Sequence, residues 1–115
     1  MSIAAGNFHT CAILDDDTLK CWGYNAVGQL GLGDAVNHGD GPNEMGDNLP
    51  AIDLGTSLVP IKVVGAENHT CVMFQGGSVK CWGYGTIGVL SKTGTIVPIG
   101  DEPGEMGTNL RPLDL

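Results

Sequence analysis

The chain has 115 residues, enough for one ordinary domain, and its 19 glycines and six prolines leave segments too short for long helices. A formal net charge of −8 opposes nonspecific binding to nucleic acid or to an anionic membrane. No stretch approaches the roughly 20 apolar residues of a membrane-spanning helix, and no signal peptide is visible. We therefore expect a protein partner with a polar or basic surface, and neither nucleic acid nor a membrane.

A sequence repeat of about sixty residues occurs twice along the chain. Residues 9–24 read HTCAILDDDTLKCWGY and residues 69–84 read HTCVMFQGGSVKCWGY; residues 39–54 and 100–115 match in the same way. Repetition at this period is typical of repeat architectures, in which each unit buries its apolar face against a neighbour. We expect repeat 1 at residues 1–60 and repeat 2, incomplete at its end, at residues 61–115.

Each unit is expected to form strands only. Short apolar runs at 2–5 and 61–64 open the units, and strands at 9–14, 18–24, 69–74 and 78–84 follow. Residues 15–17 and 75–77 suit three-residue hairpin loops, whose last position favours a left-handed backbone. Gly77 accepts that conformation freely, and Asp17 belongs to one of the few other residue types that tolerate it. The acidic run 15–17 is therefore interpreted as a turn rather than a metal-binding loop.

A three-residue loop places Cys11 opposite Cys21 and Cys71 opposite Cys81. Directly opposed side chains lie near the distance that a disulfide requires. A two-residue loop would instead place the two cysteines of a hairpin on opposite faces of the sheet. Disulfides are favoured over buried free thiols and over a metal site, because the ten-residue spacing is unlike that of structural zinc.

Other chemistry-bearing residues have a structural interpretation. His9 and His69 recur at one position of the unit, which favours an architectural hydrogen bond over catalysis. Trp22 and Trp82 are expected to pack between units, with the indole N–H bonded; an aromatic binding platform is the alternative. Acidic side chains in the first long loop suggest a calcium site, but their spacing matches no known calcium loop. These acids are Asp34, Asp40, Glu44 and Asp47. No catalytic constellation stands out, so we expect no enzyme and no cofactor.

The motifs HTC, LKCWGYN and GQLGLGD, in this order and spacing, closely resemble the repeat of the regulator of chromosome condensation (RCC1-like) family, in its cysteine-paired variant. The resemblance covers nearly the whole chain and includes Trp22-Gly23 and Trp82-Gly83. Two departures are Asp17 at a turn glycine and residues 89–91 (VLS) in place of Gln-Leu-Gly. The family implies an all-β fold with two four-stranded antiparallel β-propeller blades.

The resemblance implies a non-catalytic interaction or scaffold module and leaves two alternatives. One is a regulator of a small GTPase, of the guanine-nucleotide exchange factor type, within a complete propeller. The other is a two-blade unit that assembles into a symmetric ring. We expect a fragment of a longer propeller, with neighbouring blades from a longer chain or from homo-oligomerisation. The compartment is open, although paired cysteines slightly favour an extracellular location.

Overall fold

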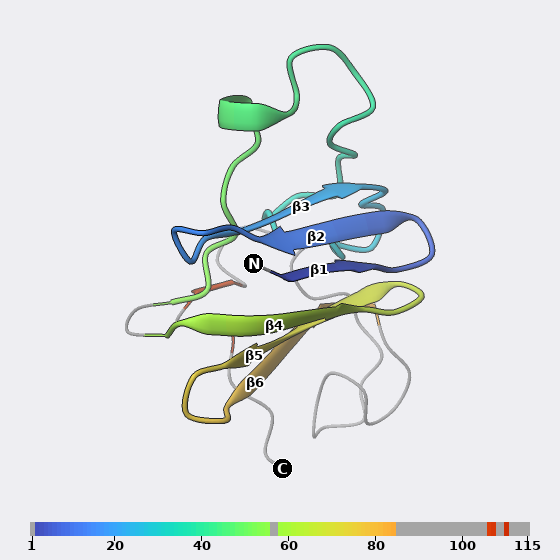
Figure 1. Cartoon of the computed structure of the whole chain (residues 1–115). Coiled ribbons are helices and arrows are strands. Elements are labelled where there is room, and N and C mark those ends of the chain that lie inside the picture. Colours follow the sequence, from blue (N-terminus) through green and yellow to red (C-terminus); the bar gives the residue numbers. More distant parts are fainter. Residues whose placement is uncertain (1, 56–57, 85–105, 108–109, 111–115) are drawn as a thin grey trace.

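A computed structural model describes residues 2–55, 58–84, 106, 107 and 110. Within these residues, six strands form two antiparallel sheets, ordered β1-β2-β3 and β4-β5-β6 (Figure 1). The strands are β1 (Ser2–Ala5), β2 (His9–Ile13), β3 (Leu19–Gly23), β4 (Pro60–Gly65), β5 (His69–Phe74) and β6 (Val79–Gly83). One short 3-10 helix, η1 (Gly46–Asn48), lies in the long loop between the sheets. Among the described residues, no helix is long and apolar enough to cross a membrane.

The predicted turns and register are confirmed. Asp17 has a φ of 67° and its amide donates to the Leu14 carbonyl, which closes a three-residue loop. Cys11 consequently pairs with Cys21 across β2 and β3. The second hairpin repeats this register, with positive φ at Gly77 and with Cys71 opposite Cys81. The turn chemistry therefore fixes which side chains share a face of each sheet.

The prediction of four strands per blade is wrong for the first sheet, which has three. Beyond β3 the long loop contributes one isolated antiparallel bridge, in which Gly23 and His38 exchange two backbone hydrogen bonds of 2.7 and 3.1 Å. Pairing stops there because Gly39, with a φ of 91°, turns the chain away from the sheet and Pro42 has no amide hydrogen to offer. In the second sheet, the residues that come directly after β6, 85–105, lie outside the described residues, so four strands in that blade stay a prediction.

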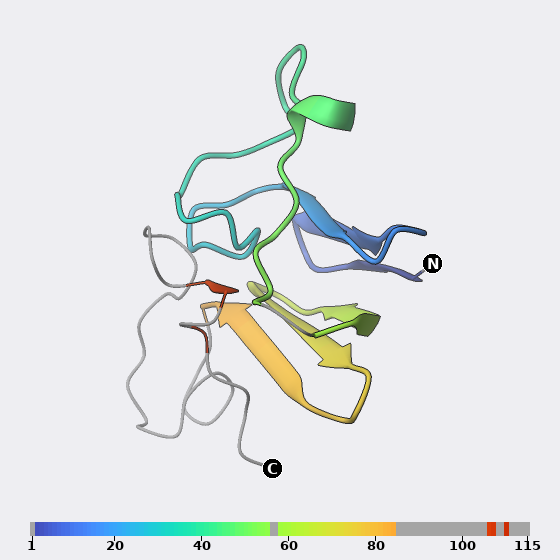
Figure 2. The same ribbon diagram turned by 90° about the vertical axis from the view of Figure 1, so that its left-hand side faces the viewer.

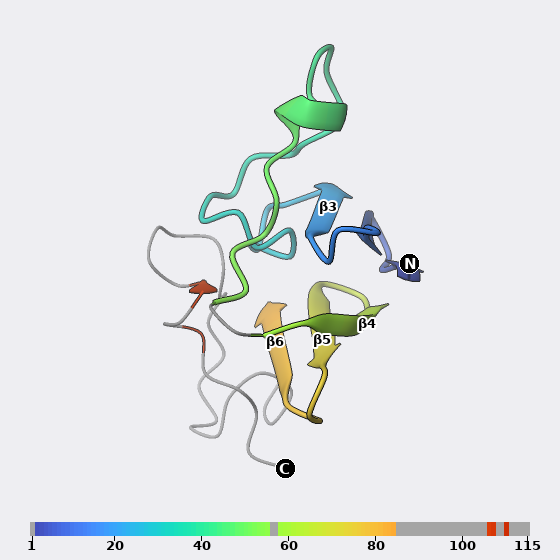
Figure 3. The ribbon, with the colours of Figure 1, turned by 60° about the vertical axis from the view of Figure 1, so that its left-hand side comes forward.

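The two sheets stack face to face, with the long loop after β3 extending to one side (Figure 2). The chain returns from η1 past β3 and reaches the neighbourhood of β6 before β4 begins (Figure 3). Between the sheets lies one cluster of buried residues. From the first sheet and its loops it includes Cys11, Ile13, Leu19, Cys21 and Leu30; from the second it includes Val63, Val72, Phe74 and Trp82. Each sheet thus buries one face against the other.

Backbones meet without intervening side chains where β1 lies against β4. A Cβ atom added at Gly65 would lie 2.6 Å from the carbonyl carbon of Ala5 and from the amide nitrogen of Gly6. A Cβ atom added at Gly6 would in turn collide with the carbonyl oxygen of Ala66. Only glycine allows two chains to approach this closely, so these positions set the separation of the sheets.

Candidate functional site

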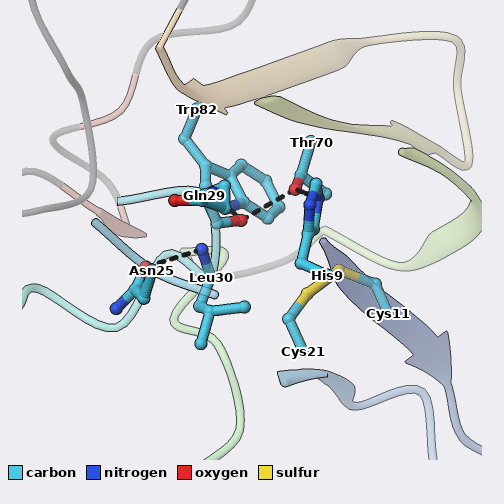
Figure 4. The surroundings of a disulfide bond; sticks show 8 residues. All are labelled: His9, Cys11, Cys21, Asn25, Gln29, Leu30, Thr70 and Trp82. Atoms are coloured by element: carbon cyan, nitrogen blue, oxygen red, sulfur yellow. Dashed lines mark hydrogen bonds between the residues drawn. A yellow bond between two sulfur atoms is a disulfide. The ribbon is translucent and has the colours of Figure 1, made fainter. Parts of the chain in front are cut away.

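A chain of buried polar groups crosses from one sheet to the other. His9 Nε2 lies 2.8 Å from Thr70 Oγ1, and the Thr70 hydroxyl donates to the Gln29 carbonyl oxygen over 2.8 Å (Figure 4). The Trp82 indole N–H donates to the same carbonyl over 3.1 Å. Buried hydrogen bonds of this kind stabilise the fold, because a polar group buried here without a partner would carry its full desolvation cost.

The hydrogen bonds determine the tautomer of His9. The single hydroxyl proton of Thr70 is directed at Gln29, so Thr70 Oγ1 accepts and His9 Nε2 carries the donated proton. His9 Nδ1 is then unprotonated, and it is buried without a hydrogen-bond partner. A histidine that donates to the hydroxyl cannot also deprotonate it. The pair therefore lacks the arrangement that activates a nucleophile.

Burial holds both repeated histidines neutral. It lowers the pKa of His9 below the ordinary 6.5, and the nearby His69 lowers that pKa further. Burial also lowers the pKa of His69, against the opposing charge of Glu67. In the unfolded chain these histidines take up protons near pH 6.5, whereas in the folded chain they do so only at lower pH.

We expect acid to destabilise the fold over the range in which only histidines titrate. Because the folded-state pKa is lowered, the stabilisation is fully present above pH 6.5 and is lost as the pH falls below it. Urea unfolding at pH values from about 8 to about 5 measures this slope, since most carboxylates titrate below that range. His9→Gln, whose amide keeps a donor N–H, should flatten the slope. An unchanged slope in that variant would contradict the assignment to His9.

Lysines at equivalent positions tie each third strand to its following loop. Lys20 Nζ donates to the Gly46 carbonyl over 2.8 Å, and Lys80 Nζ donates to the Gly107 carbonyl over 3.0 Å. Lys80 also reaches the Leu54 carbonyl of the first repeat, 3.1 Å away. Burial lowers the pKa of the Lys80 ammonium, against the opposing charge of Asp53. Sequence reasoning missed these lysines, although their recurrence in both repeats was a visible signal.

The repeated glycines are the last residues of the third strand of each sheet. Gly23 and Gly83 have φ values of 115° and 106°, and Cβ atoms there would lie 2.6 and 2.5 Å from the carbonyl oxygens of Phe8 and Asn68. The Phe8 carbonyl oxygen accepts a hydrogen bond from the Tyr24 amide, and the Asn68 carbonyl oxygen accepts one from the Tyr84 amide. The glycines therefore allow each sheet to close against its own first loop.

The structure contains both disulfides, Cys11–Cys21 and Cys71–Cys81. Their surroundings differ. Cys11 and Cys21 are fully buried between the sheets, next to His9 (Figure 4), whereas Cys71 on the outer face of the second sheet is half-buried.

Carboxylates of the first long loop accept hydrogen bonds from nearby groups of the same repeat. Asp34 Oδ1 accepts from Asn25 Nδ2 over 2.8 Å, and Glu44 Oε2 accepts from the Gly39 and Gly41 amides over 3.0 and 2.7 Å. Within the part of the chain that the structure describes, no three acidic, histidine or cysteine side chains gather as metal ligands would. The loop carboxylates have a local role instead, as acceptors that shape the turn.

An apolar hollow opens where loops of the two repeats meet. Its lining is Phe8, Tyr24, Val27 and Asn68, and its volume is about 720 Å³. The Phe8 and Tyr24 rings contact edge to face, with centroids 6.1 Å apart. Both remain exposed, Phe8 to 68%. Large exposed aromatic side chains grouped at one place are typical of binding surfaces.

Comparisons with known proteins agree with this architecture. Residues 2–29 match the family model described as the regulator of chromosome condensation (RCC1) repeat. The ultraviolet-B receptor UVR8 of Arabidopsis thaliana is 31% identical over 84% of this chain, and the human E3 ubiquitin-protein ligase HERC2 is 27% identical over 81%. The chain spans 21% and 2% of the lengths of these relatives.

A solved structure gives the same picture. The crystal structure of Prp20p from Saccharomyces cerevisiae, reported with its binding to Gsp1p and histones, superposes with a TM-score of 0.58 at 25% identity. It covers 74% of this chain, which spans 18% of that protein. Human WBSCR16 superposes over 99% of this chain with a TM-score of 0.63, but at 18% identity this likeness concerns the fold alone.

Proposed function

The chain belongs to the family of RCC1-like propeller repeats, and we propose that it is a non-catalytic protein-interaction module. Repeat 1 corresponds to residues 1–60 and repeat 2 to residues 61–115 in this proposal. Repeated side chains stabilise each unit and, at His9 and Trp82, hold the two units together, which leaves recognition to the loops. These architectural positions are His9, His69, Trp22, Trp82, Gly23, Gly83 and the four disulfide cysteines.

The observation that carries this proposal is the contrast between buried polar groups and exposed apolar ones. Thr70 and Lys80, which carry reactive groups, are buried and engaged in bonds between the repeats. Phe8 and Tyr24, which offer only contact surface, stand exposed at the hollow between the loops. With a net charge of −8, the chain attracts basic partners. We therefore assign it a protein partner that presents an apolar residue beside lysine or arginine.

Selection from a random peptide library against the disulfide-bonded chain tests this function. We expect enriched peptides to combine an apolar anchor with basic neighbours, and to lose at least about tenfold in affinity, or about 1.4 kcal/mol, on Phe8→Ala. Val36→Ala is the control, because Val36 is 61% exposed but does not line the hollow. Failure to enrich any peptide, or equal affinity for both variants, would contradict the proposal.

A regulatory function is the second candidate, as part of a complete propeller that acts as a guanine-nucleotide exchange factor. The similarity to Prp20p, a protein whose binding to Gsp1p has been described, favours it. Release of fluorescent GDP from Gsp1p, measured in the presence of a complete propeller that includes this chain, distinguishes the two functions. An interaction module leaves the release rate unchanged, whereas acceleration would support the regulatory alternative.

A further inference from the structure

The loop between β4 and β5 runs into a sequence that accepts N-linked glycans in secreted proteins. Asn68-His69-Thr70 fits the pattern Asn-x-Ser/Thr, in which the middle residue is not proline, and it is the only such sequence in the chain. The fold accounts for Thr70, because its buried hydroxyl donates to the Gln29 carbonyl oxygen between the repeats. The asparagine is left to be explained.

The architecture does not require asparagine at position 68. The first repeat has Phe8 at the equivalent position, sixty residues earlier. The fold uses the main chain of Asn68, whose carbonyl oxygen accepts a hydrogen bond from the Tyr84 amide over 2.9 Å. The main chain of Phe8 makes the equivalent bond to Tyr24. The side-chain amide of Asn68 forms no hydrogen bond with the described residues, and Asn68 is partly exposed, so its Nδ2 atom is available to carry a substituent.

A sugar attached at this position would lie beside an apolar surface. Asn68 lines the hollow together with Phe8, Tyr24 and Val27. The β1–β2 and β4–β5 loops, which carry Phe8 and Asn68, lie at the same end of the two sheets (Figure 1). The hollow, at about 720 Å³, has the size of a small-molecule site and holds a sugar ring. One face of such a ring presents only hydrogens bonded to carbon, and this face packs against aromatic side chains.

The disulfides agree with the compartment in which this modification takes place. Disulfides form and persist in the lumen of the endoplasmic reticulum and outside the cell. N-linked glycans are attached in the same lumen, to chains that are entering it. The Cys11–Cys21 and Cys71–Cys81 disulfides and the acceptor sequence therefore point to the same compartment.

We propose that Asn68 carries an N-linked glycan, and that the first sugar of this glycan packs against Phe8 and Tyr24 and covers the hollow. The transfer forms a bond between Asn68 Nδ2 and the anomeric carbon of the sugar. It breaks the bond between that carbon and the diphosphate of a lipid-linked oligosaccharide; the lipid diphosphate leaves and one amide proton is released. The glycan then excludes a partner from the hollow, a consequence that rests on the proposed function.

The order of events follows from the burial of Thr70. The acceptor sequence is recognised through its hydroxyl as well as through its asparagine. In the folded chain Thr70 is fully buried, and its hydroxyl is engaged by both His9 and Gln29. The glycan is therefore attached before the two sheets come together. Asn68 itself stays at the surface, so the attached glycan does not prevent that contact.

Expression in eukaryotic cells behind a cleavable secretion signal tests the site. After reduction, trypsin releases residues 63–80, which contain Asn68 and no other asparagine. We expect the enzyme that removes N-linked glycans to lower the mass of the secreted chain and to convert Asn68 to aspartate in this peptide. Asn68→Gln should be secreted without a glycan. A secreted wild type that is unmodified at Asn68 would overturn the proposal.

The first repeat supplies the matched control. Phe8→Asn gives it the same three residues, Asn-His-Thr, at the equivalent position. Combined with Asn68→Gln, this substitution should move the single glycan to the first repeat. Modification of the combined variant beside an unmodified wild type would show that the transferase reaches these loops and rejects Asn68, which contradicts the assignment.

The covering of the hollow is tested on chain whose glycan has been trimmed to its first sugar with an endoglycosidase. The reference is disulfide-bonded chain from the bacterial periplasm, which carries no such glycan. We expect the trimmed chain to melt at a higher temperature than the reference. Phe8→Ala should remove this gain, whereas Val36→Ala, exposed but not part of the hollow, should keep it. A gain unaffected by Phe8→Ala would place the sugar away from the rings and overturn the covering.

Peptide binding separates this proposal from the proposed function. Peptides selected on the reference chain should bind the trimmed chain at least about tenfold more weakly. Equal affinity for both chains would overturn the covering of the hollow while leaving the proposed function intact. If no peptide binds the reference chain, the proposed function fails, whereas the glycan at Asn68 is still established by mass and its contact with Phe8 by the melting temperatures.

Discussion

Replacing Trp82 by alanine is expected to lower the free energy of unfolding by about 3–5 kcal/mol. The Trp82 side chain is fully buried between the sheets and its indole N–H donates to the Gln29 carbonyl, so the substitution creates a cavity and leaves that acceptor short of one donor. A domain of this size has a total stability of about 5–15 kcal/mol, so such a loss would leave part of the chain unfolded in ordinary buffer.

The matched control for this prediction is Trp22→Ala. Trp22 occupies the same position of the first repeat but is only half-buried, because none of the described strands covers it. We expect a loss of about 1 kcal/mol, typical of a partly exposed position. Urea titration of the disulfide-bonded protein measures both variants. Equal losses would show that packing within each sheet, rather than contact between the sheets, accounts for the stability.

Gly65→Ala is expected to cost about 4 kcal/mol or more, and to separate β1 from β4. The added methyl group would lie 2.6 Å from backbone atoms of Ala5 and Gly6. Backbone atoms in a strand cannot move aside as the end of a flexible side chain can, so the sheets must part. The bond between His9 and Thr70 should then be lost, and the pKa of His9, followed by NMR, should rise toward its ordinary value.

Gly41→Ala is the control for the glycine substitution. A methyl group there would lie 3.3 Å from a carboxylate oxygen of Glu44, which sits at the end of a flexible side chain in an exposed loop. We expect a change below about 1 kcal/mol and no shift in the titration of His9. A Gly65→Ala variant that kept wild-type stability would show that the sheets lie farther apart than the structure places them.

The strands and the disulfide pairs could be predicted because local chemistry determines them. Residues 15–17 specify a three-residue turn, the turn specifies the register, and the register sets Cys11 opposite Cys21. Each step involves neighbours in the sequence. The strand count failed because it was carried over from the family, whereas in the first sheet the residues after His38 turn the chain away after one bridge.

The bonds between the sheets could not be predicted in the same way. The acceptor for Thr70 and Trp82 is the main-chain oxygen of Gln29. Every residue has a main-chain oxygen, so the sequence does not indicate which one accepts these bonds. Repetition suggested that His9 and His69 share one role, yet only His9 reaches the other sheet. The position of a residue in the repeat specifies which face of the sheet its side chain lies on. Whether another sheet covers that face depends on which of the two sheets the residue belongs to.

The order of these contacts along the chain also bears on biosynthesis. Thr70, Lys80 and Trp82 donate to the carbonyl groups of Gln29 and Leu54, and in these three bonds the acceptor is translated before the donor. Chains generally fold from the N-terminal part as they leave the ribosome. The first sheet with its returning loop is therefore in place as a template when the second emerges. If the second repeat were synthesised before the first, these three donors would have no acceptor until the first repeat was made.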